Sequence, residues 1–170
     1  ILKLLGSEEL YRLFHLIIPF IIFIFLFKCL SLRFKDVEKN KLILISSIIF
    51  LSPTIRSYSI WPDSYLYGLL FFVIAIYHYL VFINSNTKFF NIYQNIIFLS
   101  LSSYFMPIFS VFSFYFFINF VRILLNKKLY NKVYLLILFN LLLAAPAFYY
   151  IFYLDINFLQ SSGEWGLYEK

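Results

Sequence analysis

The stretch that decides the organisation of this chain is Ser52-Pro-Thr-Ile-Arg-Ser-Tyr-Ser-Ile-Trp-Pro-Asp-Ser64, which lies between two strongly apolar runs. It carries two charged residues, Arg56 and Asp63, and two large aromatic residues, Tyr58 and Trp61. Charged groups are costly inside a bilayer unless they meet water, each other or a substrate. We therefore predict a compact polar loop at a membrane surface, with these four residues as the candidate substrate-binding residues.

The composition excludes an ordinary soluble domain. Hydrophobic residues make up 63% of the chain and charged residues 13%, and the mean hydropathy is +0.87. Soluble domains are about half apolar and about a quarter charged. The net charge of +6 comes from basic residues in short connections, which fits membrane topology rather than nucleic-acid binding. We predict a polytopic protein that has the lipid bilayer as its partner and no nucleic acid.

Six apolar runs predict the membrane-spanning helices of an all-α transmembrane bundle. The second run is short for a span and closed by Pro53, so it either extends back through Lys41 or ends partway across at a cavity. We expect residues 1–170 to be part of a single domain and, because the chain begins with Ile1, a piece of a longer protein. The runs are 10–30, 42–51, 65–83, 89–104, 107–125 and 133–154.

The distribution of charge predicts the orientation of these runs. Ten of the 14 basic residues lie in connections that an alternating path puts on one side, and short basic connections face the cytoplasm. We therefore expect both ends of the chain, and the segment from Arg56 to Asp63, on the extracytoplasmic side. The ten are Lys28, Arg33, Lys35, Lys39, Lys41, Lys88, Arg122, Lys127, Lys128 and Lys132.

The four candidate residues each have a functional and a structural interpretation. The planar guanidinium of Arg56 suits an anionic group such as phosphate, and Asp63 would then orient a hydroxyl, bind a cation or hold the arginine. The alternative is an ordinary salt bridge between them at the membrane surface. Tyr58 and Trp61 either stack on a sugar or lipid headgroup or anchor the chain at headgroup level.

Other polar residues are expected to serve structure. Arg12 and His15 share a face at the start of the first helix, and His78 is expected to be a hydrogen-bonded packing residue. The single cysteine, Cys29, excludes internal disulfides and is expected to be a buried thiol near a helix end. No sequence-local metal motif occurs, so no cofactor is assigned, although a divalent metal remains open. A polar stripe predicted to face other helices consists of Asn91, Gln94 and Asn95.

Two segments and a turn resemble the GT-C glycosyltransferases, which include protein O-mannosyltransferases and the aminoarabinose transferases of lipid A. Gly6-Ser-Glu-Glu-Leu-Tyr-Arg12-Leu-Phe-His-Leu is similar to the segment that opens a membrane helix in that family. Arg56-Ser-Tyr-Ser-Ile-Trp-Pro62-Asp63 looks like the family's Pro … Arg … Pro-Asp stretch. The turn from Tyr104 to Pro107 corresponds to a tight outer turn, although the basic residue often found there in the family is missing.

The resemblance implies an enzyme of the bacterial inner membrane that moves a sugar from a polyprenyl-phosphate donor to a glycan, lipid or protein acceptor outside the cytoplasm. It also implies that the general base lies before Ile1, that Asp63 borders the active-site cavity and that Arg56 holds the donor phosphate. Three alternatives stay open: a transporter or flippase of lipid-linked sugars, a polysaccharide polymerase or ligase, and a structural membrane subunit.

Overall fold

A computed structural model describes residues 8–60, 64–85 and 89–149, and all regular secondary structure in them is helical. The prediction of an all-α protein is therefore confirmed. The elements are α2 (Glu8–Arg33), α3 (Lys39–Ser47), the 3-10 helix η1 (Ile48–Leu51), α4 (Pro53–Ile60), α5 (Ser64–Ser85), α6 (Phe90–Phe105), the 3-10 helix η2 (Pro107–Phe109), α7 (Ser110–Asn126) and α8 (Tyr130–Tyr149).

Three helical stretches are long and apolar enough to cross a membrane: His15–Arg33, Ser64–Ser85 and Pro107–Asn126. The helices Lys39–Leu51 and Pro53–Ser59 reach that length together, but they are bent by 66° and form either a broken span or a re-entrant loop. The apolar part of α8, Tyr130–Pro146, is shorter. The chain is thus a membrane protein with three such helices among the described residues, or four if the bent pair counts as one span.

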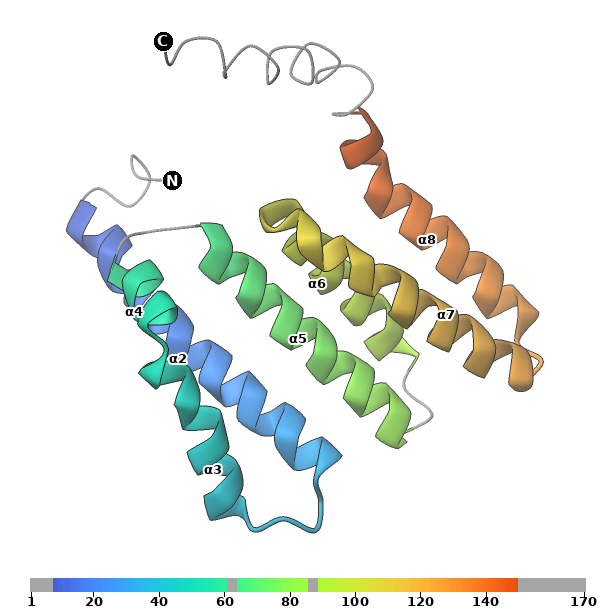
Figure 1. The fold of residues 1–170 in the computed structure, drawn as a ribbon. Coiled ribbons are helices and arrows are strands. Elements are labelled where there is room, and N and C mark those ends of the chain that lie inside the picture. Colours follow the sequence, from blue (N-terminus) through green and yellow to red (C-terminus); the bar gives the residue numbers. More distant parts are fainter. Residues whose placement is uncertain (1–7, 61–63, 86–88, 150–170) are drawn as a thin grey trace, which may run out of the picture.

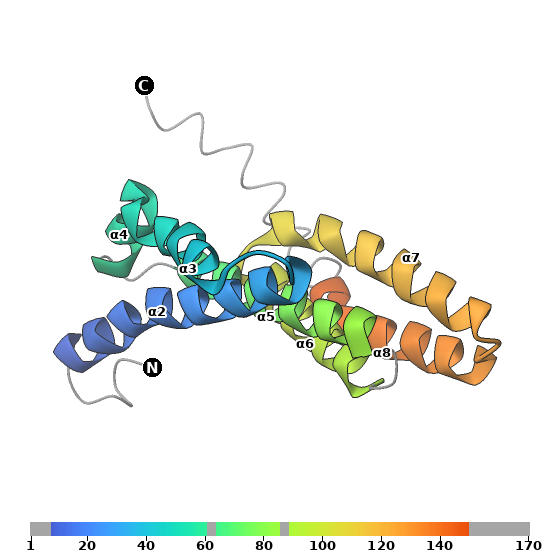
Figure 2. The same ribbon diagram turned by 90° about the horizontal axis from the view of Figure 1, so that it is seen from below.

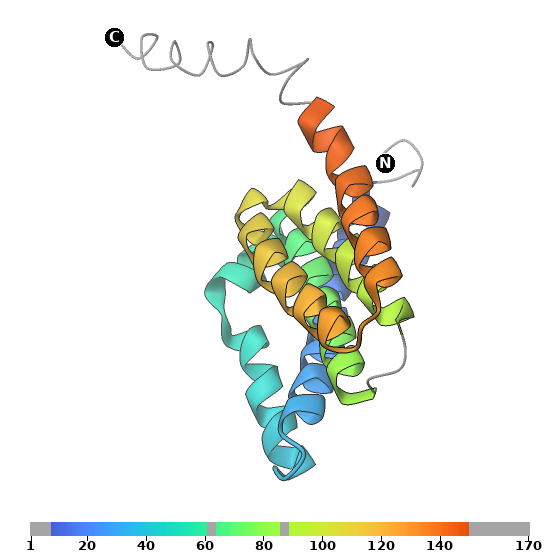
Figure 3. The ribbon, with the colours of Figure 1, turned by 90° about the vertical axis from the view of Figure 1, so that its right-hand side faces the viewer.

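When α3 and α4 are taken together, successive helices run in alternating directions and pack side by side (Figure 1). α5 lies between α2 and α6, whereas α3 and α4 lie on one flank of the bundle and α7 and α8 on the other (Figures 1 and 2). α7 and α8 diverge from their shared turn, as two directions of view agree (Figures 1 and 3). The centre of the bundle is therefore the α5–α6 pair.

Polar side chains of α6 bind backbone carbonyls of α5. The Asn95 amide Nδ2 donates to the carbonyl of Ala75 at 2.7 Å, and the Ser102 hydroxyl donates to the carbonyl of Gly68 at 2.7 Å. Gly68 permits this approach, because a Cβ built there would lie 2.8 Å from Cγ of Met106. Hydrogen bonds between helices, together with small residues that let backbones approach, are the typical means of helix association in lipid.

The predicted polar stripe on 91–95 lies at this interface. Asn91 is buried, and its Oδ1 lies 3.0 Å from Nδ1 of His78 on α5. The His78 ring also stacks on Phe98, with centroids 5.7 Å apart and an interplanar angle of 2°. The packing role predicted for His78 and the interhelical role predicted for Asn91 and Asn95 are confirmed, whereas Gln94 is only half-buried.

The contact of α2 with α5 is mainly apolar. Ile18 and Ile22 on α2 are buried in a cluster with residues of α5. Cys29 belongs to the same cluster, and its thiol donates to the carbonyl of Val73 at 3.7 Å. The prediction of a buried thiol near the end of a helix is confirmed, since α2 ends at Arg33.

The turn between α7 and α8 has the hydrogen bonds of a Schellman motif. Lys128 has a φ of 56°, its N–H donates to the carbonyl of Leu125 at 2.9 Å, and the N–H of Leu129 donates to the carbonyl of Leu124 at 3.0 Å. These bonds satisfy carbonyls at the end of α7 that the helix itself leaves open. Leu129 packs against the core cluster that contains Leu124, as is common for this motif.

Candidate functional site

The segment predicted as a polar loop is in fact helical over most of its length, which corrects the sequence-based expectation. Ser52 has an extended backbone, with φ −65° and ψ 118°, and α4 starts at Pro53. The Ser52 hydroxyl accepts a hydrogen bond from the N–H of Ile55 at 3.4 Å, and its carbonyl accepts one from the N–H of Arg56 at 3.1 Å. Serine at the N-cap followed by proline at the first helical position is a known signal for the start of a helix. The Ser-Pro pair could therefore have predicted α4 from the sequence.

The same pair of residues breaks the helix that precedes α4. Proline has no N–H to continue a helix, and it disfavours the helical conformation at the residue before it. The result is the bend of 66° between α3–η1 and α4. α4 nevertheless continues in the general direction of α3 and lies beside the first half of α2 (Figure 1).

One face of α4 packs against the bundle. Ile55 contacts the cluster formed by α2 and α5, and Ser59 is buried with its hydroxyl bonded to the carbonyl of Ile55 at 2.7 Å. Arg56 follows Ile55 directly and is exposed. The guanidinium of Arg56 is therefore presented on the surface of a helix that its apolar neighbours hold in place.

Arg56 and Tyr58 are both on α4 but do not face each other, because residues two apart on a helix point in different directions. The Tyr58 ring stacks on Tyr65 at the start of α5, with centroids 5.6 Å apart and an interplanar angle of 14°. Trp61 and Asp63 lie outside the described residues. The structure thus gives a position to two of the four predicted site residues and assigns Tyr58 a packing contact between α4 and α5.

His15 has an environment that the sequence interpretation did not specify. Its side chain is fully buried, and its ring lies 5.2 Å from that of Tyr67 on α5. Tyr67 in turn stacks on Phe105 at the end of α6, with centroids 5.7 Å apart. The spacing of His15, Ile18 and Ile22 along one helix face is the sequence signal for this burial. His15 is therefore a buried side chain that packs between α2 and α5.

Two lysines, one near the C-terminal end of α2 and one near the start of α8, lie over aromatic rings. The Lys28 ammonium lies 5.3 Å from the ring centroid of Phe25 and 5.8 Å from that of Tyr77. The Lys132 ammonium lies 5.6 Å from the ring centroid of Phe89. These distances are within the range of cation–π attraction. The two ends of the bundle therefore differ, since α4, the helix that carries Arg56, lies beside the first half of α2, away from these lysines (Figure 1).

Within the described ranges, no group of three or more His, Cys, Asp and Glu side chains could hold a metal ion. Whether the protein uses a divalent metal therefore stays an open prediction from the sequence. Comparisons of the chain with protein-family models, with characterised proteins and with solved structures return no significant match. The functional argument consequently depends on the residues themselves.

Proposed function

We propose that this chain is part of a membrane glycosyltransferase that moves a sugar from a polyprenyl-phosphate donor to an acceptor on the extracytoplasmic face. The observation that carries the proposal is that Arg56 is exposed on α4, and this helix lies away from the basic α2–α3 and α7–α8 turns (Figure 1). A fixed arginine at a membrane surface is suited to bind a phosphate through two parallel hydrogen bonds.

The proposal includes a topology of six crossings in a bacterial inner membrane. It is supported by the alternating helix directions and by the basic residues that flank the α2–α3 and α7–α8 turns (Figure 1). In this topology α3 and α4 together form the second crossing. Arg56 and the start of α5 then face the outside.

The topology is tested with a single cysteine at Ser57, which is exposed on α4, in a Cys29→Ser background. Ser57 is preferable to Ser59, because Ser59 is buried. We expect an impermeant thiol reagent to label the Ser57→Cys variant from outside intact cells. A cysteine at exposed Lys127 is the matched control and is expected to react only after the cells are opened. The reverse pattern would contradict the topology.

The proposed reaction requires few catalytic groups from the protein. Polyprenyl phosphate is already a leaving group, so the enzyme has to neutralise its charge, position the anomeric carbon and accept a proton from the acceptor. Arg56 would neutralise the phosphate, and Asp63 would orient the acceptor, bind a cation or hold Arg56.

The test is sugar transfer by the full-length protein in vesicles, with radiolabelled polyprenyl-phosphate sugars as donors. We expect Arg56→Ala to lower turnover by about 100-fold or more, as removal of a group that stabilises developing charge does in other enzymes. Arg56→Lys is expected to recover part of the loss, and Asp63→Asn to lower turnover as well. The control is Arg122→Ala, the same change at an exposed arginine near the C-terminal end of α7.

Unchanged turnover in Arg56→Ala would make this arginine a structural or anchoring residue. Absence of transfer in the wild type would favour a second candidate function, a transporter of lipid-linked sugars. One observation supports this alternative: the discontinuous α3–α4 helix is a feature that transporters use at substrate sites. Movement of a labelled lipid-linked sugar across the same vesicles, without transfer to an acceptor, would identify it.

A further inference from the structure

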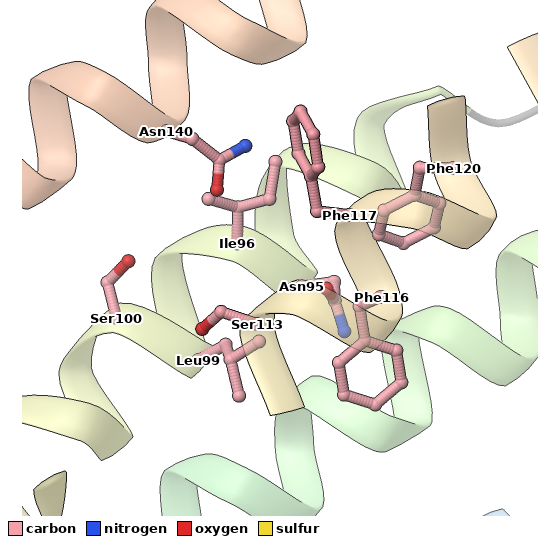
Figure 4. A pocket seen from close by; sticks show the side chains of 9 residues that line it. All are labelled: Asn95, Ile96, Leu99, Ser100, Ser113, Phe116, Phe117, Phe120 and Asn140. Carbon is pink, nitrogen blue, oxygen red and sulfur yellow. The ribbon is translucent and has the colours of Figure 1, made fainter. Parts of the chain in front are cut away.

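A small polar cavity lies between α6, α7 and α8, far along the chain from Arg56 (Figure 4). It offers about 10 Å³ of space for the centre of a water molecule. Its walls are mainly phenylalanine and other apolar side chains, with four polar residues among them. These are Asn95 and Ser100 on α6, Ser113 on α7 and Asn140 on α8.

Asn95 is the fully buried polar residue of this cavity. Its Nδ2 donates to the carbonyl of Ala75, which is an acceptor only, so the orientation of the amide is determined. The other end of the amide, Oδ1, is buried and accepts no hydrogen bond from the part of the chain that the structure describes. An amide oxygen without a donor in an apolar interior costs about 1–3 kcal/mol, so a donor at this point would stabilise the bundle.

The other polar side chains that line the cavity have groups that can form hydrogen bonds with a water molecule. Asn140 already uses Nδ2 once, in a bond of 2.9 Å to the carbonyl of Leu136 in its own helix, and it retains a second N–H. The hydroxyls of Ser113 and Ser100 each offer a donor and an acceptor. A water molecule needs two to four polar partners and space of at least about 10–15 Å³ for its centre. The cavity has about 10 Å³, at the lower end of this range, and four of its lining residues are polar. A sugar or a phosphate group is too large.

We propose that this cavity is a binding site for one water molecule, which donates to Oδ1 of Asn95 and bridges it to Ser113 of α7 and Asn140 of α8. The water would connect three helices at a point where the surrounding contacts are aromatic packing. This inference is independent of the proposed glycosyltransferase activity.

The site is tested by solid-state NMR of the full-length protein in vesicles, with ¹³C- and ¹⁵N-labelled asparagine and transfer of magnetisation from water. We expect transfer to Cγ of Asn95 in the wild type. Ser113→Val replaces the hydroxyl by two methyl groups, which removes a partner and fills part of the cavity, and we expect it to lower this transfer at least threefold. Ser110→Val, the same change at an exposed position of the same helix, is expected to leave it unchanged.

No transfer to Asn95 in the wild type, alongside transfer to exposed Asn131, would overturn the proposal. Equal transfer in the wild type and in folded Ser113→Val would also overturn it, because water would then reach Asn95 without this cavity. The remaining asparagine signals report whether each variant is folded. If Ser113→Val does not fold, Ser100→Val takes its place with the same expected loss.

Discussion

The α5–α6 pair and the α3–α4 segment use the same kinds of polar residue in opposite ways. On α6, the Ser102 hydroxyl donates to a carbonyl of the neighbouring helix, at 2.7 Å. On α3, the equally buried Ser46 hydroxyl donates to the carbonyl of Leu42 in its own helix, also at 2.7 Å. Ser59 on α4 likewise bonds within its helix. Polar side chains of α6 thus bind α5, whereas the buried hydroxyls of Ser46 and Ser59 bond within their own helices.

This difference shows how one bundle can combine a fixed centre with a more independent flank. Hydrogen bonds between helices restrict the distance and register of the pair that they join, and bonds within one helix restrict neither. The broken helix on the flank is also the one that carries Arg56 on its surface. This helix is joined to the bundle by the apolar packing of Ile55, whereas α5 and α6 are joined by hydrogen bonds.

The largest expected effect comes from crowding the α5–α6 contact with Gly68→Val. The added Cβ would lie 2.8 Å from Cγ of Met106, and overpacking of this kind costs about 1–3 kcal/mol. We expect a loss of unfolding free energy in that range, measured by equilibrium unfolding in mixed micelles. Gly68→Ala is the control and should lose less. If both variants keep the wild-type stability, Met106 swings away and the contact is not close-packed.

A smaller effect is expected from the same substitution made in each region. Ser102→Ala removes a bond between helices and should lower the unfolding free energy by about 0.6 kcal/mol and by no more than about 1.7 kcal/mol, the average and the maximum found for such bonds in a membrane protein. Ser46→Ala removes a bond within one helix and should change it by less than about 0.5 kcal/mol. The measurement is the same unfolding experiment. Equal losses would show that the two regions do not differ in this respect.

The smallest change in stability is expected for Pro53→Ala, which acts on the α3–α4 bend. Alanine permits the helical conformation at Ser52 that proline disfavours, so the two helices can align. Spin labels at exposed Lys41 and Ser57 should move apart toward about 24 Å, the length of a straight helix of this span, with the stability changed by less than about 0.5 kcal/mol. Electron–electron double resonance in a Cys29→Ser background measures the distance. An unchanged distance would mean that the packing of Ile55 sets the bend.

Much of the fold could be predicted from the sequence because long apolar runs have few stable alternatives in lipid. The runs 10–30, 65–83 and 107–125 correspond to three of the observed helices. The stripe of Asn91 and Asn95 was predicted to face other helices, since its spacing puts both residues on one face. The segment after Ser52 was predicted wrongly, because its charged and turn-forming residues outweighed the Ser-Pro start signal.

The sequence predicted which residues form the candidate site, but not how their side chains are arranged. Arg56 and Tyr58 are close in sequence, yet helix geometry directs them differently, and the stacking of Tyr58 on Tyr65 depends on how α4 meets α5. The cavity beside Asn95 was not predicted at all. Its partners Ser113 and Asn140 are on helices that lie next to α6 only after the chain has folded.

The sequence by itself determined that this is a helical membrane protein, where three of its helices run and at which end its basic residues gather. These properties follow from apolar length and charge, which act locally along the chain. Only the tertiary structure decided which polar groups meet: His78 with Asn91, Ser102 with the carbonyl of Gly68, and Asn95 with the cavity between α6, α7 and α8. The physical reason is that a buried polar group is satisfied by whatever packing brings within about 3 Å, and no pattern along the chain encodes that distance.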